Sequence, residues 1–365
     1  MSDLFTTPLN AWHHAQGAKM APFAGWDMPI QYKGILVEHQ HTRTAAGLFD
    51  ICHMGEFLLH GEGAKDSLAT AVTHNLDTLK VGRCRYGFLL NEAGGILDDL
   101  IVYCLAEDSY MLVVNGACVE TDFAAIKSRI APTLHFEDVS AATAKLDLQG
   151  PLSIDVMEAF LGMSLRDLPY FAFKTVTATI NGVAMDIMLS RTGYTGELGY
   201  ELYLPWKHAE AVWLALLNDE RVMAIGLGAR DTLRLEVGLP LYGQDLDTEH
   251  TPVEAGYGSM ITSTADFAGK AGLANIKQCL IALSIQGRRA ARHGDAVALP
   301  SGDIIGVVTS GSIAPSLGHA IALAYVDAAH AELTDYEVRT ARAVIPATRC
   351  AAPFYTAGTA RTKLS

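Results

Sequence analysis

The chain has 365 residues, half of them hydrophobic, which is enough for more than one buried core, so we expect two or three domains. Its 40 Asp and Glu against 27 Lys and Arg give a formal net charge of −13, which argues against a nucleic acid as the partner. Six cysteines without a CxxC pair, no secretory leader and no apolar run near ~20 residues predict a cytoplasmic protein with reduced thiols and no membrane contact.

The region up to residue 73 combines helix signals with an unusual apolar segment. Thr6-Thr7-Pro8 offers the hydroxyl and the proline that are typical of a helix start. Residues 20–32 are dense in aromatic residues, Pro and Met. They predict an irregular segment that Phe23 and Trp26 hold to the core, or that contacts a ligand directly. The pattern then predicts helices over 35–46 and 63–73 and a strand over 48–59.

Two pairs of possible metal ligands lie in this region, and neither predicts a metal site. His39 and His41 are two residues apart on the predicted helix, so their side chains diverge. Cys52 and His53 adjoin on the predicted strand and therefore face opposite ways.

Residues 84–115 predict a β-meander, and they contain the most informative feature of the chain. Three apolar runs are separated by turn residues at 91–95 and 106–109. Asp98 and Asp99 interrupt the middle run, where successive side chains face opposite ways and one of the two can stay solvated. Burying an unpaired carboxylate is costly. Two interpretations stay open: an Asx-type cap of the turn, or one carboxylate aimed into a pocket to hold a cation or take a proton.

The following segments predict helices over 118–130, 151–160 and 205–218 and strands over 145–149, 175–180 and 184–189. Between them, residues 191–203 carry glycines at a G-x-x-G-x-x-G spacing, which differs from the dinucleotide-binding fingerprint. This stretch predicts either a plain hairpin or a loop whose backbone approaches a ligand and presents Tyr194, followed by a strand with Glu201.

Residues 226–236 predict a Leu-rich helix on which Arg230 and Arg234 share a face at i,i+4 spacing. The interpretations are a buried intrahelical ion-pair lattice and a guanidinium fork for a ligand carboxylate. From residue 279 onward, alternating apolar residues with frequent Gly, Ser and Pro predict a small antiparallel β-barrel or sandwich.

In this order the chain resembles the aminomethyltransferase family, the T-proteins of the glycine cleavage system. No single stretch decides the match, but together they span nearly the whole length. The matching stretches are AGWDMPIQY (24–32), RTAAGLFDICHMGEF (43–57), NEAGGILDDLIVY (91–103), RTGYTGELGYEL (191–202), GLGARDTLRLEVGLPLYGQDLD (226–247) and VVTSGSIAPSLGHAIALAYV (307–326).

The resemblance implies an α+β fold, a three-domain clover leaf of antiparallel sheets and helices with a C-terminal β-barrel. The implied domains are 1–50 with 140–225, 51–139 with 226–272, and 279–365. The implied reaction moves the methylene of an aminomethyl group from the lipoyl arm of the H-protein to tetrahydrofolate, with release of ammonia. The lipoylated H-protein and folate are the implied partners, and no metal, nucleic acid or membrane is implied.

The resemblance also implies roles for single residues. Asp99 is the catalytic carboxylate and Asp98 its solvated neighbour. Arg230 steadies the site or meets polar groups of the folate, or else pairs with Glu236. The divergent C-terminal tail, which includes Tyr355, receives no role. The residues expected to bind folate or substrate are Met54, Tyr86, Ile101, Asn115, Tyr194, Glu201 and Arg230.

Two alternative functions remain within this fold. One is a folate-dependent demethylase acting on a small methylated substrate. The other is a non-catalytic, folate-binding assembly factor, whose known relatives lack an acid at the position of Asp99. No basic cluster in the sequence identifies a surface that would receive the H-protein.

Overall fold

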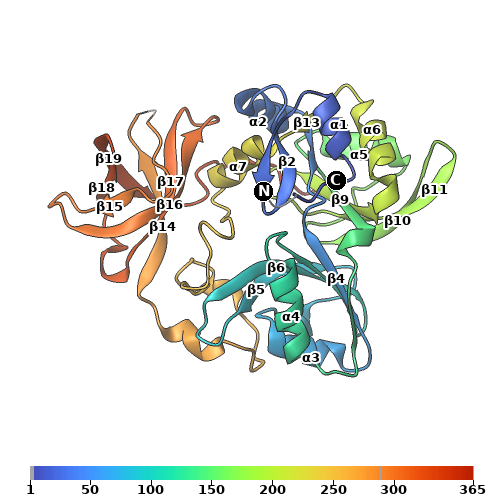
Figure 1. The fold of residues 1–365 in the computed structure, drawn as a ribbon, viewed down its shortest axis with the longest axis horizontal. Coiled ribbons are helices and arrows are strands. Elements are labelled where there is room, and N and C mark those ends of the chain that lie inside the picture. The colour runs from blue at the N-terminus through green and yellow to red at the C-terminus, as the bar shows by residue number, and fades with distance from the viewer. Residues whose placement is uncertain (1–3, 288, 365) are drawn as a thin grey trace.

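The computed structural model describes residues 4–287 and 289–364, which form three lobes (Figure 1). Two lobes are built on open sheets covered by helices, and the third is a closed β-barrel. The predicted α+β class with a C-terminal barrel is therefore confirmed. Among the described residues, no helix has the length and apolar character needed to cross a bilayer.

The first lobe contains a six-stranded sheet in which only the edge strand β13 runs parallel to its neighbour. Alternate residues of β10 face the core, as expected for a half-buried strand. Trp213 on α6 is fully buried against this core together with Leu146 and Leu148. In spatial order the strands are β10 (Phe173–Ile180), β11 (Val183–Ser190), β12 (Gly199–Pro205), β9 (Thr143–Gln149), β3 (Ala46–Asp50) and β13 (Val222–Ile225), with helices α1 (Asn10–Ala15), α2 (Ile35–Thr44), α5 (Ser153–Leu161) and α6 (Ala209–Leu217).

The second lobe contains a five-stranded antiparallel sheet that includes the predicted meander. The turn before β6 is closed by Asn91, whose Oδ1 accepts hydrogen bonds from the N–H groups of Ala93 and Gly95, both at 2.9 Å. A Cβ at Gly95 would lie 1.9 Å from the carbonyl oxygen of Thr248, so only glycine fits there. The strands are β5 (Cys84–Leu90), β6 (Ile96–Ala106), β7 (Ser109–Val114), β4 (Gly55–His60) and β8 (His135–Asp138), with helices α3 (Ala64–Ala71) and α4 (Val119–Arg129).

The third lobe is a closed six-stranded barrel with an apolar interior. In spatial order its strands are β14 (Gln278–Ile285), β17 (His319–Asp327), β16 (Ile304–Ala314), β15 (Ala296–Ala298), β18 (Asp335–Thr340) and β19 (Ala343–Cys350).

Two elements differ from their prediction. Residues 20–32 are not irregular but form a hairpin of β1 (Lys19–Phe23) and β2 (Trp26–Gln31), whose turn uses positive φ at Ala24 and Gly25. The strand predicted over 48–59 is two strands that belong to different sheets. The chain turns between them because the Asp50 carboxylate accepts a hydrogen bond from the Cys52 N–H at 2.9 Å.

Helix α7 (Leu227–Glu236) packs against α2, β2 and the barrel strand β16. Its Arg234 is 1% exposed and donates to Asp245 Oδ2 at 2.6 Å and to Ser310 Oγ of the barrel at 2.8 Å. Asp245 is fully buried. This buried ion pair joins the helix to the barrel.

Replacing Arg234 with Met should destabilise the protein strongly, because the Asp245 carboxylate would stay buried without its cation. We expect a loss of about 3–5 kcal/mol in the free energy of unfolding, measured by urea denaturation. The control is Asp231→Asn, since the Asp231 side chain is 50% exposed although it also pairs with Arg234. The control should lose less than about 1 kcal/mol, and equal losses in the two variants would contradict this assignment.

Candidate active site

A cavity of about 1210 Å³ lies between the first two lobes and helix α7. Its wall contains residues of β5, β6, β9, β12 and α7, and of the loops at 78–83 and 239–260. A cavity of this size can enclose a ligand larger than an ordinary metabolite.

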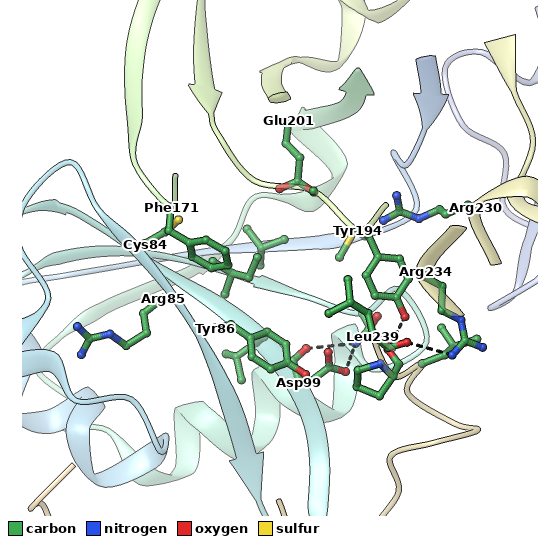
Figure 2. A pocket seen from close by; sticks show the side chains of 18 of the residues that line it. Cys84, Arg85, Tyr86, Asp99, Phe171, Tyr194, Glu201, Arg230, Arg234 and Leu239 are labelled. Carbon is green, nitrogen blue, oxygen red and sulfur yellow. Dashed lines mark hydrogen bonds between the residues drawn. The ribbon is translucent and has the colours of Figure 1, made fainter. Parts of the chain in front are cut away.

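All the residues predicted to bind folate or substrate lie in the wall of this one cavity, and so does Asp99. Their roles remain predictions. Arg234, which the sequence offered with Arg230 as a guanidinium fork, also lies in the wall. Sequence reasoning missed Lys145 and considered His53 only as a metal ligand, because nothing in their local pattern distinguishes them from ordinary structural residues. Figure 2 shows that Asp99 lies between Arg85 on one side and Arg230 and Arg234 on the other.

The two aspartates of β6 face opposite ways, as the strand alternation predicted. On one face Leu100 and Val102 pack into the core beneath α3 and α4, and on the other face Asp99 and Ile101 reach the cavity. The predicted solvation of Asp98 is wrong, since its side chain points to the helix-covered face and Asp98 is 0% exposed. The cap interpretation is also wrong, because Asn91 closes the turn.

Asp99 is held by Asn115, which follows β7 directly. Asn115 Nδ2 donates to Asp99 Oδ1 at 2.9 Å and to Asp98 Oδ1 at 2.8 Å. The Tyr86 hydroxyl faces Asp99 and has no other hydrogen-bond partner among the described residues. Burial and the negative charge of Asp98 raise the pKa of Asp99 to about 7, against the smaller opposing effect of Tyr86 and Asn115. A carboxyl group with this pKa can both accept and release a proton near neutral pH.

Glu201 is a second carboxylate in the cavity wall, and its pKa is shifted in the direction opposite to that of Asp99. Burial opposes its ionisation, but the charge of Lys145 and a hydrogen bond from Thr192 outweigh this effect and lower the pKa of Glu201. Lys145 Nζ lies 3.0 Å from Glu201 Oε1, and Thr192 Oγ1 donates to Oε2 at 2.5 Å. Glu201 is therefore a fixed anionic acceptor in the cavity wall.

Only part of the predicted intrahelical lattice of α7 forms: Arg234 pairs with Asp231 at 2.8 Å, whereas Arg230 pairs outside the helix. Arg230 Nη1 donates to Asp147 Oδ2 of β9 at 2.8 Å, and its guanidinium lies 4.8 Å from the centroid of the Tyr194 ring. The alternative pairing of Arg230 with Glu236 is wrong, because Glu236 pairs with Arg43 at 2.9 Å. Burial raises the pKa of Asp147 to about 6 although Arg230 opposes the rise.

One end of the cavity carries cations that make no ion pair with any described residue. Arg83 Nη2 donates to the Tyr170 carbonyl at 2.9 Å, and the Arg361 guanidinium lies 6.0 Å from the centroid of the Tyr170 ring. Arg85 donates to Thr78 Oγ1 at 2.8 Å. The members of this basic cluster are Lys80, Arg83, Arg85 and Arg361. Lys80, Arg83 and Arg85 are close in the sequence, but only the fold shows that they line one cavity together with Arg361.

The C-terminal tail contributes Arg361 to the cavity wall, whereas the part around Tyr355 lies beside the cavity. Tyr355 is absent from the cavity wall, and its ring lies 4.2 Å from the guanidinium carbon of Arg43. The Tyr355 N–H donates to the Glu236 carbonyl at 2.7 Å. Tyr355 therefore holds the tail against α2 and α7.

Comparisons with known proteins give a consistent picture. Residues 9–265 match the GCVT N-terminal domain, and residues 278–356 match the glycine cleavage T-protein C-terminal barrel domain. The aminomethyltransferase of Saccharopolyspora erythraea is 42% identical, over 97% of this chain and 99% of the relative. That of Parasynechococcus marenigrum is 43% identical, over 96% of this chain and 98% of the relative.

A solved structure agrees with these sequence matches. The crystal structure of glycine cleavage system aminomethyltransferase T from Bartonella henselae superposes with a TM-score of 0.91 at 35% identity, covering 98% of this chain and 99% of that one. The resemblance found in the sequence is confirmed. This chain belongs to the aminomethyltransferase family, the T-proteins of the glycine cleavage system.

Proposed function

We propose that Asp99 is the catalytic carboxylate with which this chain transfers the methylene of an aminomethyl group from the lipoyl arm of the H-protein to tetrahydrofolate. The products are 5,10-methylenetetrahydrofolate, ammonia and the dihydrolipoyl H-protein. The observation that carries the assignment is a carboxyl group of pKa about 7 in the wall of a large cavity, held by Asn115 and facing Tyr86.

The polar groups of the cavity wall complement tetrahydrofolate. The ionised Glu201 suits the ring N–H and amino group of the pterin, which together form a planar donor edge. The glutamyl tail carries two carboxylates that need cations. Because Arg230 and Arg234 are already paired with aspartates, the basic cluster of Lys80, Arg83, Arg85 and Arg361 is the better site for that tail.

The reaction needs proton transfer but no oxidant or reductant. N5 and N10 of the folate each lose a proton as they bond to the methylene carbon, while the carbon–sulfur and carbon–nitrogen bonds of the aminomethyl thioether break. The two protons leave with the ammonia nitrogen and the lipoyl sulfur. Asp99 can take a proton from the folate and release it to a leaving group, and its negative charge stabilises the iminium-like carbon between these steps.

The remaining expectations are part of the same proposal. The lipoylated H-protein is the proposed donor, and the cytoplasm is the proposed compartment. The six cysteines are all free, which suits a reducing environment. The assembly-factor alternative is disfavoured because a carboxylate is present where such a protein lacks one.

Asp99→Asn should abolish turnover while the folate still binds, since the amide keeps the shape but cannot accept the proton. We expect a loss of about 10²–10⁴ in the rate of ammonia release from aminomethylated H-protein, with tetrahydrofolate affinity changed only a few-fold. Asp77→Asn, on an exposed side chain, is the matched control and should keep full activity. A fully active Asp99→Asn variant would show that another group moves the proton.

The pH dependence should follow the ionisation of Asp99. Since the ionised form is the base and the pKa is about 7, kcat/KM should be constant above this pH and fall about ten-fold per unit below it. Tyr86→Phe removes a group that favours the ionised form and should move this acid limb to higher pH. A limb that stays in place in Tyr86→Phe would contradict the assignment of the limb to Asp99.

Arg83→Gln should weaken binding of the folate tail rather than slow the chemistry. We expect the KM for tetrahydrofolate to rise about ten-fold with a nearly constant kcat, because one charge-assisted contact is lost. Tetrahydropteroate, which lacks the glutamyl group, should bind the wild type and the variant equally well. Lys127→Gln on α4, away from the cavity wall, is the control. Equal losses with both ligands would place the tail elsewhere.

A further inference from the structure

A buried cluster of polar side chains lies on the face of β6 opposite to Asp99. Asp98 is fully buried on the opposite face of β6, and Asp122 on α4 is 1% exposed. A carboxylate oxygen of Asp98, a carboxylate oxygen of Asp122 and the Sγ atom of Cys118 lie within 4.8 Å of one another. None of these three residues is part of the cavity wall, so the proposed reaction does not use them directly.

Asn115 links this buried cluster to the catalytic residue. Its backbone N–H donates to Asp98 Oδ2 at 2.9 Å, and its Nδ2 donates both to Asp98 Oδ1 and to Asp99 Oδ1. An amide nitrogen carries two hydrogens, so both are used. The orientation of Asn115 therefore depends on Asp98 accepting two hydrogen bonds, and an ionised carboxylate does this best.

The carboxyl groups of Asp98 and Asp122 are in contact, and neither pairs with a cation in the described part of the chain. Two carboxylates in contact without a cation do not both ionise, so the pair retains one proton. Burial and the charge of Asp98 raise the pKa of Asp122 to about 10, which places that proton on Asp122. The second oxygen of Asp122, Oδ2, is buried and has no hydrogen-bond partner.

We propose that Asp122 is a positioning residue that keeps its proton, donates it to Asp98 as a hydrogen bond and so maintains Asp98 as the ionised group that orients Asn115. The carboxyl of Asp122 does not reach the reacting atoms. It acts through Asp98 in two ways: the hydrogen bonds of Asn115 hold the catalytic carboxyl in place, and the negative charge of Asp98 raises its pKa.

A bound cation in place of the proton would require Asp122 and Cys118 to ionise. Burial and the charges of Asp98 and Asp122 raise the pKa of Cys118 as well. A retained proton is therefore the simpler way to neutralise the cluster. The test must distinguish this proton from a bound cation.

The pH dependence involves the titratable groups around Asp99 and around the Asp98–Asp122 pair. Burial raises the pKa of each neighbouring tyrosine, so these side chains stay neutral near pH 7. Asp98 is then the negative charge that governs Asp99. The groups facing Asp99 are Tyr86, Tyr194, Tyr257 and Asp98, and those facing the Asp98–Asp122 pair are Cys118 and Tyr242.

The first arm of the test is infrared spectroscopy of the protein without substrates. A carboxyl group that keeps its proton gives a carbonyl band distinct from that of a carboxylate, and this band should persist in the wild type at pH 8.5. Burial also raises the pKa of Glu56, so Glu56 contributes a band to every variant. The spectrum of the wild type minus that of Asp122→Asn, which keeps the side-chain shape, should therefore show a positive carbonyl band. A difference spectrum without this band would overturn the proposal. This arm does not depend on the proposed function.

The second arm uses the pH profile of ammonia release and therefore rests on the proposed function. Asp122→Asn can still donate to Asp98 and should keep the acid limb in place. The leucine of Asp122→Leu cannot donate a hydrogen bond, so Asp98 should take up a proton itself. Because its negative charge no longer raises the pKa of Asp99, the acid limb should move to lower pH. A fall of about one unit would raise the relative rate at pH 6 roughly five-fold. Asp98→Asn should shift the limb in the same direction.

The double variant separates action through Asp98 from a general structural effect. Asp98→Asn with Asp122→Leu should shift the limb no further than Asp98→Asn alone, because Asp122 acts only through Asp98. An unmoved limb in Asp122→Leu would overturn the proposal. If Asp122→Leu does not fold, the infrared comparison with Asp122→Asn decides. Stoichiometric binding of Zn²⁺ or Mg²⁺ by the wild type, lost in Asp122→Asn, would overturn the proposal by showing that a metal ion, not a proton, neutralises the cluster.

Discussion

The pairing of buried charges along helix α7 is the constraint on which the rest of the structure depends. Arg230 pairs with Asp147 of the first sheet, Arg234 with Asp245 beside the barrel, and Glu236 accepts from Arg43 of α2. Removing one partner of such a buried pair leaves an uncompensated charge, which is far more costly than losing a surface contact. These pairs therefore fix the helix, and with it one wall of the cavity, relative to two of the three lobes.

Neighbouring charges and burial also set the ionisation of the carboxyl groups in the cavity. Lys145 and Thr192 keep Glu201 ionised, whereas burial and Asp98 leave Asp99 close to half protonated at neutral pH. Environments that push two carboxyl pKa values apart give each group a different role, here an acceptor for a ligand edge and a proton carrier. Arg230 and Arg234 of the cavity wall are already paired with aspartates. The basic cluster makes no ion pair with any described residue, so it offers the site for ligand carboxylates.

Much of this could be predicted from the sequence. The meander over 84–115 follows from apolar runs separated by turn residues, and the class of the C-terminal barrel follows from its alternation. Family resemblance selected a set of residues that the fold then gathers in one cavity wall. The hairpin at 19–31 was not predicted, because Pro and Met carry little strand signal and the pairing of β1 with β2 supplies the regularity. The burial of Asp98 was missed because a strand pattern does not show that α4 covers that face.

The sequence by itself determined that Asp98 and Asp99 point in opposite directions, because side chains alternate along a strand with a period of two. Its resemblance to a family determined the fold and the choice of Asp99. Only the tertiary structure decided that Asp98 lies buried against Asp122, and that Arg361 joins a basic cluster with residues of the second lobe. These features depend on which elements pack against each face and on contacts between residues far apart in the chain, and local sequence carries no signal for either.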